Sequence, residues 1–89
     1  MTTPAELVEP LPRDLRHNGA WLTEMFRQRR RGEGGIAIYL QNSKPGEVTG
    51  HVFKVFQIDI VNEREVIGSE LAVEHSLDKA LGKASAHYP

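Results

Sequence analysis

Apolar residues recur with a helical period in the first third of the chain. In the segment 14–31 their spacing is typical of one face of a 3.6-residue helix. These residues are Trp21, Leu22, Met25 and Phe26. Asn18 suits the N-cap of such a helix, and Gly32 suits a left-handed cap at its end. The pattern therefore predicts a helix that begins near residue 14 and ends near residue 31.

The middle of the chain alternates with period 2 instead. The segments 36–40, 51–61 and 64–73 are rich in β-branched and aromatic residues and read as strands. The Pro45-Gly46 pair between the first two fits a type II turn, and the polar pair Asn62-Glu63 separates the last two. We therefore expect antiparallel connections throughout, with Gly68 marking a bulge in the third strand.

A short helix is expected after the strands. Ser76 is a good N-cap with Asp78 in the first turn, and an apolar stripe follows. The stripe consists of Leu77, Ala80, Leu81 and Ala84. The predicted fold is α+β, a three-stranded antiparallel sheet with two helices packed on one face, in the order α-β-β-β-α. Prolines favour an extended or flexible arm over residues 1–12, which leaves 13–89 as a single compact domain.

The second predicted strand is apolar on both faces. One parity carries Val52, Phe56, Ile58 and Ile60, whereas the other carries Phe53, Val55 and Val61. Three explanations remain open: a bulge that switches parity, the N-terminal arm covering the second face, or a second subunit covering it.

The α-β-β-β-α order resembles that of double-stranded RNA-binding domains over most of the chain. The resemblance implies a basic entrance to the last helix that contacts phosphate. In this chain the entrance is Ser76-Leu77-Asp78-Lys79, and Leu77 and Asp78 stand where basic residues are needed. The phosphate-binding motif is missing, so the similarity is one of element order.

Composition narrows the classes of protein. A chain of 89 residues supports one core, and its 39% hydrophobic and 26% charged content is that of a folded domain. The absence of cysteine removes disulfides and thiolate chemistry, which favours a cytoplasmic location. No segment approaches the roughly 20 apolar residues of a membrane span, and the N-terminal sequence lacks the pattern of a signal peptide.

Residues with catalytic or ligand chemistry form no recognisable motif. The histidines lack metal-ligand spacing, and no serine lies in a nucleophile-elbow context. The histidines are His17, His51, His75 and His87. The glycine-rich segment Gly32-Glu33-Gly34-Gly35 follows a predicted helix and precedes a strand, the reverse of a phosphate-binding loop. We therefore expect no cofactor, no metal and no catalytic residue, so the chain is not predicted to be an enzyme.

The remaining candidates are contact residues. Four arginines lie within five positions and suit either an acidic protein surface or a phosphate backbone. They are Arg27, Arg29, Arg30 and Arg31. Tyr39, Phe53 and Val55 complete the predicted partner-binding set, since their parity places them on the free face of the sheet.

The leading hypothesis is a small protein-interaction module that binds another protein through this face. It includes a homodimer and, by analogy with compact proteins encoded by phages and mobile elements, an inhibitor or adaptor of a larger protein machine. The first alternative is a nucleic-acid-binding domain that uses the arginines 27–31, against which the net charge of −1 argues. The second is an enzyme whose site forms between subunits.

Overall fold

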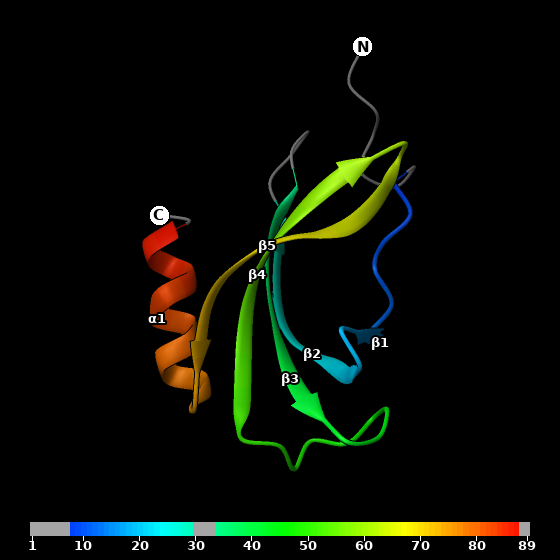
Figure 1. Ribbon diagram of the computed structural model, residues 1–89. Coiled ribbons are helices and arrows are strands. Elements are labelled where there is room, and N and C mark those ends of the chain that lie inside the picture. The colour runs from blue at the N-terminus through cyan, green and yellow to red at the C-terminus, as the bar shows by residue number, and fades with distance from the viewer. Residues whose placement is uncertain (1–7, 30–33, 88–89) are drawn as a thin grey trace.

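The computed structural model describes residues 8–29 and 34–87. Five strands precede one helix in this part of the chain: β1 (Asp14–His17), β2 (Ala20–Arg29), β3 (Gly35–Asn42), β4 (Val52–Val61), β5 (Arg64–Glu74) and α1 (Leu77–His87). Each strand pairs antiparallel with the next, so the spatial order equals the sequence order. The sheet curls into a half-barrel, with α1 on one side and β1 on the other (Figure 1).

The predicted three-stranded sheet with two helices is wrong, because the segment 14–31 does not form a helix. It forms β1 and β2, joined by a two-residue turn at Asn18-Gly19. Both turn residues have positive φ, 50° at Asn18 and 81° at Gly19, as a type I′ turn requires. The Asn-Gly pair therefore acts as a hairpin turn and not as a helix cap. The similarity to double-stranded RNA-binding domains ends with this correction, because the observed order is β-β-β-β-β-α.

A β-bulge explains why the apolar residues of β2 mimic helical spacing. Leu22 faces the inside of the curl. Trp21 lies on the opposite face of β2 and is paired with Asn42 of β3. The register then shifts between Glu24 and Phe26, which leaves Met25 as the extra residue. Beyond the shift, Met25 and Phe26 both pack against the helix-side core. Adjacent apolar pairs thus arise from two-sided burial and a bulge.

The other elements follow the sequence prediction. The three predicted strands are confirmed as β3, β4 and β5, and the last helix is confirmed as α1. Ser76 caps this helix, since its Oγ accepts a hydrogen bond from the Lys79 N–H at 3.2 Å. The irregular register opposite Gln57 confirms a bulge at Gly68. In the described part of the chain, no helix combines the length and apolarity needed to cross a bilayer.

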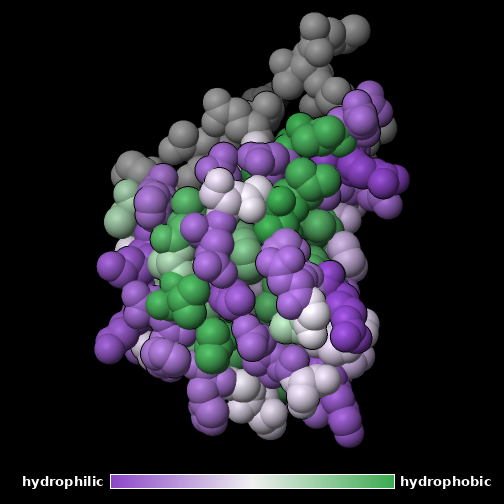
Figure 2. Space-filling view, in the orientation of Figure 1, coloured by the Kyte–Doolittle hydropathy of each residue, from purple (hydrophilic) through white to green (hydrophobic). Residues whose placement is uncertain are grey.

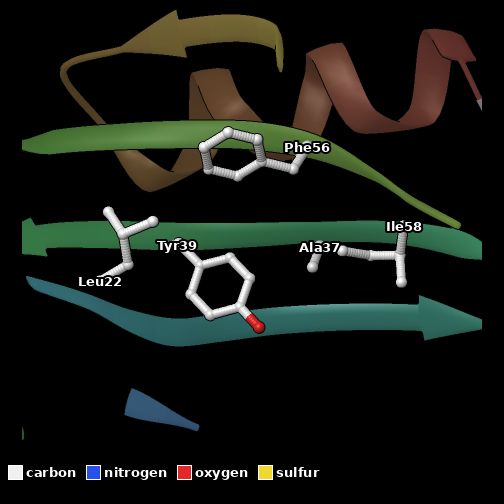
Figure 3. Close-up of a cluster of buried hydrophobic side chains, with 5 residues drawn as sticks. All are labelled: Leu22, Ala37, Tyr39, Phe56 and Ile58. Atoms are coloured by element: carbon white, nitrogen blue, oxygen red, sulfur yellow. The ribbon is translucent and has the colours of Figure 1, made fainter. Parts of the chain in front are cut away.

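The central strands bury side chains on both faces. Inside the curl lie Leu22, Ala37, Tyr39, Phe56 and Ile58 (Figure 3). On the other face, α1 covers a second cluster made of Ile36, Ile38, Val55, Ala80 and Ala84. This arrangement accounts for the two apolar faces of β4. The helix covers one, and Leu11 of the arm together with Leu15 of β1 packs on the other, while the register between β3 and β4 stays regular.

The end of the N-terminal arm lies on the sheet. Val8 is buried, and Glu9 forms a parallel bridge to Arg64 at the start of β5. The Glu9 N–H donates to the Glu63 carbonyl, and the Glu65 N–H donates to the Glu9 carbonyl. Residues 1–7 of the predicted arm lie outside the described residues.

Two glycine-to-alanine substitutions should change stability in opposite directions. Gly19→Ala places a Cβ at φ 81°, so we expect the free energy of unfolding to fall by about 1 kcal/mol. Gly82→Ala lies in α1, where an added Cβ meets nothing within 4 Å, so we expect a gain of about 0.5–1 kcal/mol. Urea unfolding of both variants measures the pair. Equal signs would contradict the turn assignment or the helix assignment.

Candidate functional site

The arginine cluster of the sequence lies in an internal network. Arg27 Nη1 lies 2.7 Å from Glu65 Oε1, and Arg29 Nη2 lies 2.6 Å from Glu65 Oε2. The Glu65 side chain is 1% exposed, whereas the two arginine side chains are 20% and 25% exposed. Two guanidiniums of β2 thus bind one buried carboxylate of β5. This pairing joins β2 and β5, which are not neighbours in the sheet, through side chains.

The same network holds the arm. The Leu11 N–H donates to Glu65 Oε1 at 3.0 Å, and Arg27 Nη2 donates to the Leu11 carbonyl at 3.1 Å. Arg27 Nη2 also donates to the Tyr39 hydroxyl at 3.3 Å. We name the group Arg27, Arg29, Glu65 and the Leu11 backbone the Glu65 latch.

Electrostatics in the latch keep Arg27 charged and Tyr39 neutral. Burial lowers the pKa of Arg27, but the Tyr39 hydrogen bond and the carboxylates of Glu24 and Glu65 raise it above its ordinary value overall. Burial raises the pKa of Tyr39, although Arg27 opposes the shift. Arg27 Nε lies 2.5 Å from Glu24 Oε1 without the alignment of a hydrogen bond. The latch is therefore a charged group whose members are satisfied mainly by one another.

The predicted partner-binding residues lie in three different places. Arg27, Arg29 and Tyr39 come together in the latch region, and Tyr39 is 0% exposed. Val55 is buried in the cluster beneath α1, and Phe53 packs against that cluster. Arg30 and Arg31 lie outside the described residues. The structure thus brings Arg27, Arg29 and Tyr39 together, with the two arginines partly exposed and Tyr39 buried.

A solvent-open hollow lies at the opposite end of β2 from the latch. Its volume is about 470 Å³, and it opens to solvent between the β1–β2 turn and the β3–β4 loop. Its lining consists of Arg16, Gly19, Ala20, Trp21, Gln41, Asn42, Ser43, Glu47, Thr49 and Gly50. We name it the Arg16–Trp21 hollow.

A buried amide builds the base of this hollow. Asn42 Nδ2 donates to Thr23 Oγ1 and to the carbonyls of Leu40 and Glu47, and Asn42 Oδ1 accepts from the Gly50 N–H. These bonds fix the β3–β4 loop against the end of the sheet. Because both ends of the amide have partners, Asn42 shapes the hollow and is not a free ligand group.

Asp14 ties the same loop to β1. Its Oδ1 accepts hydrogen bonds from Thr23 Oγ1 and from the Gly46 N–H, each at 2.8 Å. The Thr23 hydroxyl, followed by the Gly46 amide, lowers the pKa of Asp14 below its ordinary value. The Asp14 carboxylate is therefore charged at neutral pH and already engaged within the chain.

Arg16 and Trp21 form the wall on the side of the turn. They face each other across the β1–β2 hairpin, and the Arg16 guanidinium carbon lies 6.0 Å from the centre of the Trp21 ring. Among the described residues, Arg16 forms no ion pair with a carboxylate. The hollow thus presents an exposed guanidinium beside a half-buried aromatic ring.

The backbone of β1 borders the hollow with an open edge. The Glu24 N–H donates to the Arg13 carbonyl at 2.8 Å, so the backbone carbonyl of Arg13 points toward β2. Hydrogen-bonded positions alternate along an antiparallel pair, so the backbone groups of Asp14 and Arg16 point away from β2. No described strand lies beside them, because β1 is the margin of the sheet.

Sequence reasoning missed this site, since Trp21 was placed on the apolar face of a predicted helix and Arg16 was assigned no role. The missed signal is the Asn18-Gly19 pair, because a two-residue hairpin turn there places Arg16 opposite Trp21. Within the described residues, no three histidine or acidic side chains gather closely enough to hold a metal ion. Comparison of the chain with protein-family models, curated proteins and solved structures gives no match.

Proposed function

We propose that this chain is a small, non-catalytic protein-interaction module that binds an extended segment of a partner protein along the open edge of β1. The observation that carries the proposal is that this edge ends in the Arg16–Trp21 hollow. Strand addition gains affinity from main-chain hydrogen bonds and specificity from pockets for alternate side chains. Arg16 supports both parts, since its backbone lies on the edge and its side chain lines the hollow.

The other margin of the sheet is less suited to strand addition. The arm already occupies the start of β5 through the Glu9 bridge, and the bulge at Gly68 interrupts the strand. Such bulges twist an edge away from incoming strands. Figure 2 shows separate apolar patches divided by polar residues on the face that carries β4, β5 and α1. These features favour β1 as the binding edge.

The proposal covers several biological uses. An inhibitor or an adaptor of a larger protein machine would bind its target in this way, and the β1 edge of a second copy would make the module a homodimer. The cysteine-free composition supports a cytoplasmic location as part of the same proposal. The nucleic-acid alternative is less favoured, because Arg27 and Arg29 already bind Glu65.

Peptide selection tests the binding edge. Random dodecapeptides displayed on phage are selected against the immobilised protein, and selected peptides are titrated into ¹⁵N-labelled protein. We expect the Asp14 and Arg16 amides to shift and to exchange more slowly with solvent, because their N–H groups become hydrogen-bonded. The amides of Val66 and Val73 on β5 serve as the internal control and should not change. Failure to select any peptide, or changes confined to β5 and α1, would refute the proposal.

A further inference from the structure

The charged side chains around the Arg16–Trp21 hollow differ in whether they already have hydrogen-bond partners within the chain. The two nearby acids have donors within the chain: Asp14 accepts from Thr23 and Gly46, and Glu47 Oε2 accepts from Ser43 Oγ at 3.3 Å. Arg16, in contrast, contacts only the Trp21 ring among the interactions of the described residues. The group left for an incoming ligand is therefore positive.

The contact with Trp21 also prepares the guanidinium for a planar anion. A guanidinium beside an aromatic ring keeps its N–H donors, which lie in the guanidinium plane and suit two-pronged binding of a carboxylate. The tryptophan ring limits the positions that the long arginine side chain adopts, which reduces the entropy lost on binding. The half-buried ring also offers an apolar surface to the residue that carries the anion.

Resting on the proposed function, we infer that the segment bound along β1 carries an aspartate or glutamate whose carboxylate binds Arg16 in the hollow, beside an apolar or aromatic residue on Trp21. The partner is thus an extended protein segment with an acidic residue next to an apolar one. In a strand, alternate side chains point to the same face. The acidic residue must therefore stand at a position of the bound segment whose side chain points to the hollow side.

A phosphate backbone fits this site less well than a single carboxylate. Asp14 and Glu47 lie at the same end of the sheet, and the whole chain has a net charge of −1. A polyanion would bring several negative charges toward these acids, whereas one side-chain carboxylate meets Arg16 alone. The observations therefore favour an acidic peptide over a nucleic acid.

Parallel selections on charge variants test the inference. Dodecapeptides are selected against the unchanged protein, Arg16→Glu, and Arg13→Gln, which alters an exposed arginine that does not line the hollow. We expect an acidic residue at one fixed peptide position with the unchanged protein and with Arg13→Gln. With Arg16→Glu we expect a lysine or arginine at that position instead. A merely structural role of Arg16 would not reverse the preferred charge.

Synthetic peptides give the size of the effect. Replacing the selected acidic residue with its amide should weaken binding about tenfold to the unchanged protein and about twofold or less to Arg16→Gln. Equal loss in both proteins would overturn the acidic partner, while shifts of the Asp14 and Arg16 amides would still uphold strand addition. Selection of no peptide at all would overturn both. Tighter binding of a random-sequence single-stranded DNA, weakened by Arg16→Gln, would overturn the peptide in favour of phosphate.

Discussion

Replacing Glu65 with alanine is expected to lower the free energy of unfolding by about 2–4 kcal/mol. The substitution leaves the guanidiniums of Arg27 and Arg29 without the carboxylate that lies 2.7 and 2.6 Å away. Removing one partner of a buried ion pair typically lowers the free energy of unfolding by about 3–5 kcal/mol, because the other charge stays poorly solvated. Both arginine side chains keep some contact with water, which reduces the expected loss. Urea unfolding followed by circular dichroism measures it.

A surface carboxylate on the same strand is the matched control. Glu70 lies 3.6 Å from Lys54 and its side chain is 46% exposed, so Glu70→Ala should cost less than about 0.5–1 kcal/mol. The Leu11 amide gives a second readout, because its acceptor is Glu65 Oε1. Its hydrogen exchange should accelerate in Glu65→Ala and stay slow in Glu70→Ala. Equal stability losses with an unchanged Leu11 amide would show that the latch does not hold the arm.

The latch gives Arg27 and Arg29 a partner that the arginine run in the sequence does not reveal. Clustered arginines near a predicted helix end suggest a free basic surface, but Arg27 and Glu65 are 38 positions apart in the chain. Only the curl of the sheet and the arm bring them together. Sequence patterns report local spacing, so a partner supplied by a distant strand leaves no signal in them. The proposed contact surface therefore moves from these arginines to Arg16.

The local patterns predict the second part of the fold well. Alternation, the polar break at Asn62-Glu63 and the Ser76 cap give β3, β4, β5 and α1. These elements follow from the residues of the turns and from an alternation of side chains that no bulge interrupts before Gly68. The sequence pattern does not predict a strand over residues 20–29, because the bulge at Met25 breaks the alternation with period 2. Giving the Asn18-Gly19 turn more weight than the helical spacing would have yielded both the hairpin and the Arg16–Trp21 wall.

The two-sided sheet makes the central strands sensitive to truncation. Phe56→Ala is expected to lower the free energy of unfolding by about 3–5 kcal/mol, as for other buried phenylalanines. Phe56 is 2% exposed, and its ring lies on the inside of the curl (Figure 3). It meets Tyr39 with ring centres 6.2 Å apart and His17 with ring centres 5.5 Å apart, both edge to face. The substitution thus removes apolar contacts and two aromatic pairs, and leaves a cavity on the inside of the curl.

Val61 on the same strand provides the control for this prediction. Its side chain is 50% exposed, so Val61→Ala should change stability by less than about 0.5 kcal/mol. Phe56→Leu should fall between the two, because it keeps most of the apolar volume but loses the aromatic pairs. The order Phe56→Ala, Phe56→Leu, Val61→Ala in urea unfolding therefore measures how tightly the inner face is packed. A loss below about 1 kcal/mol for Phe56→Ala would mean that α1 and its side of the sheet supply nearly all of the stabilising core.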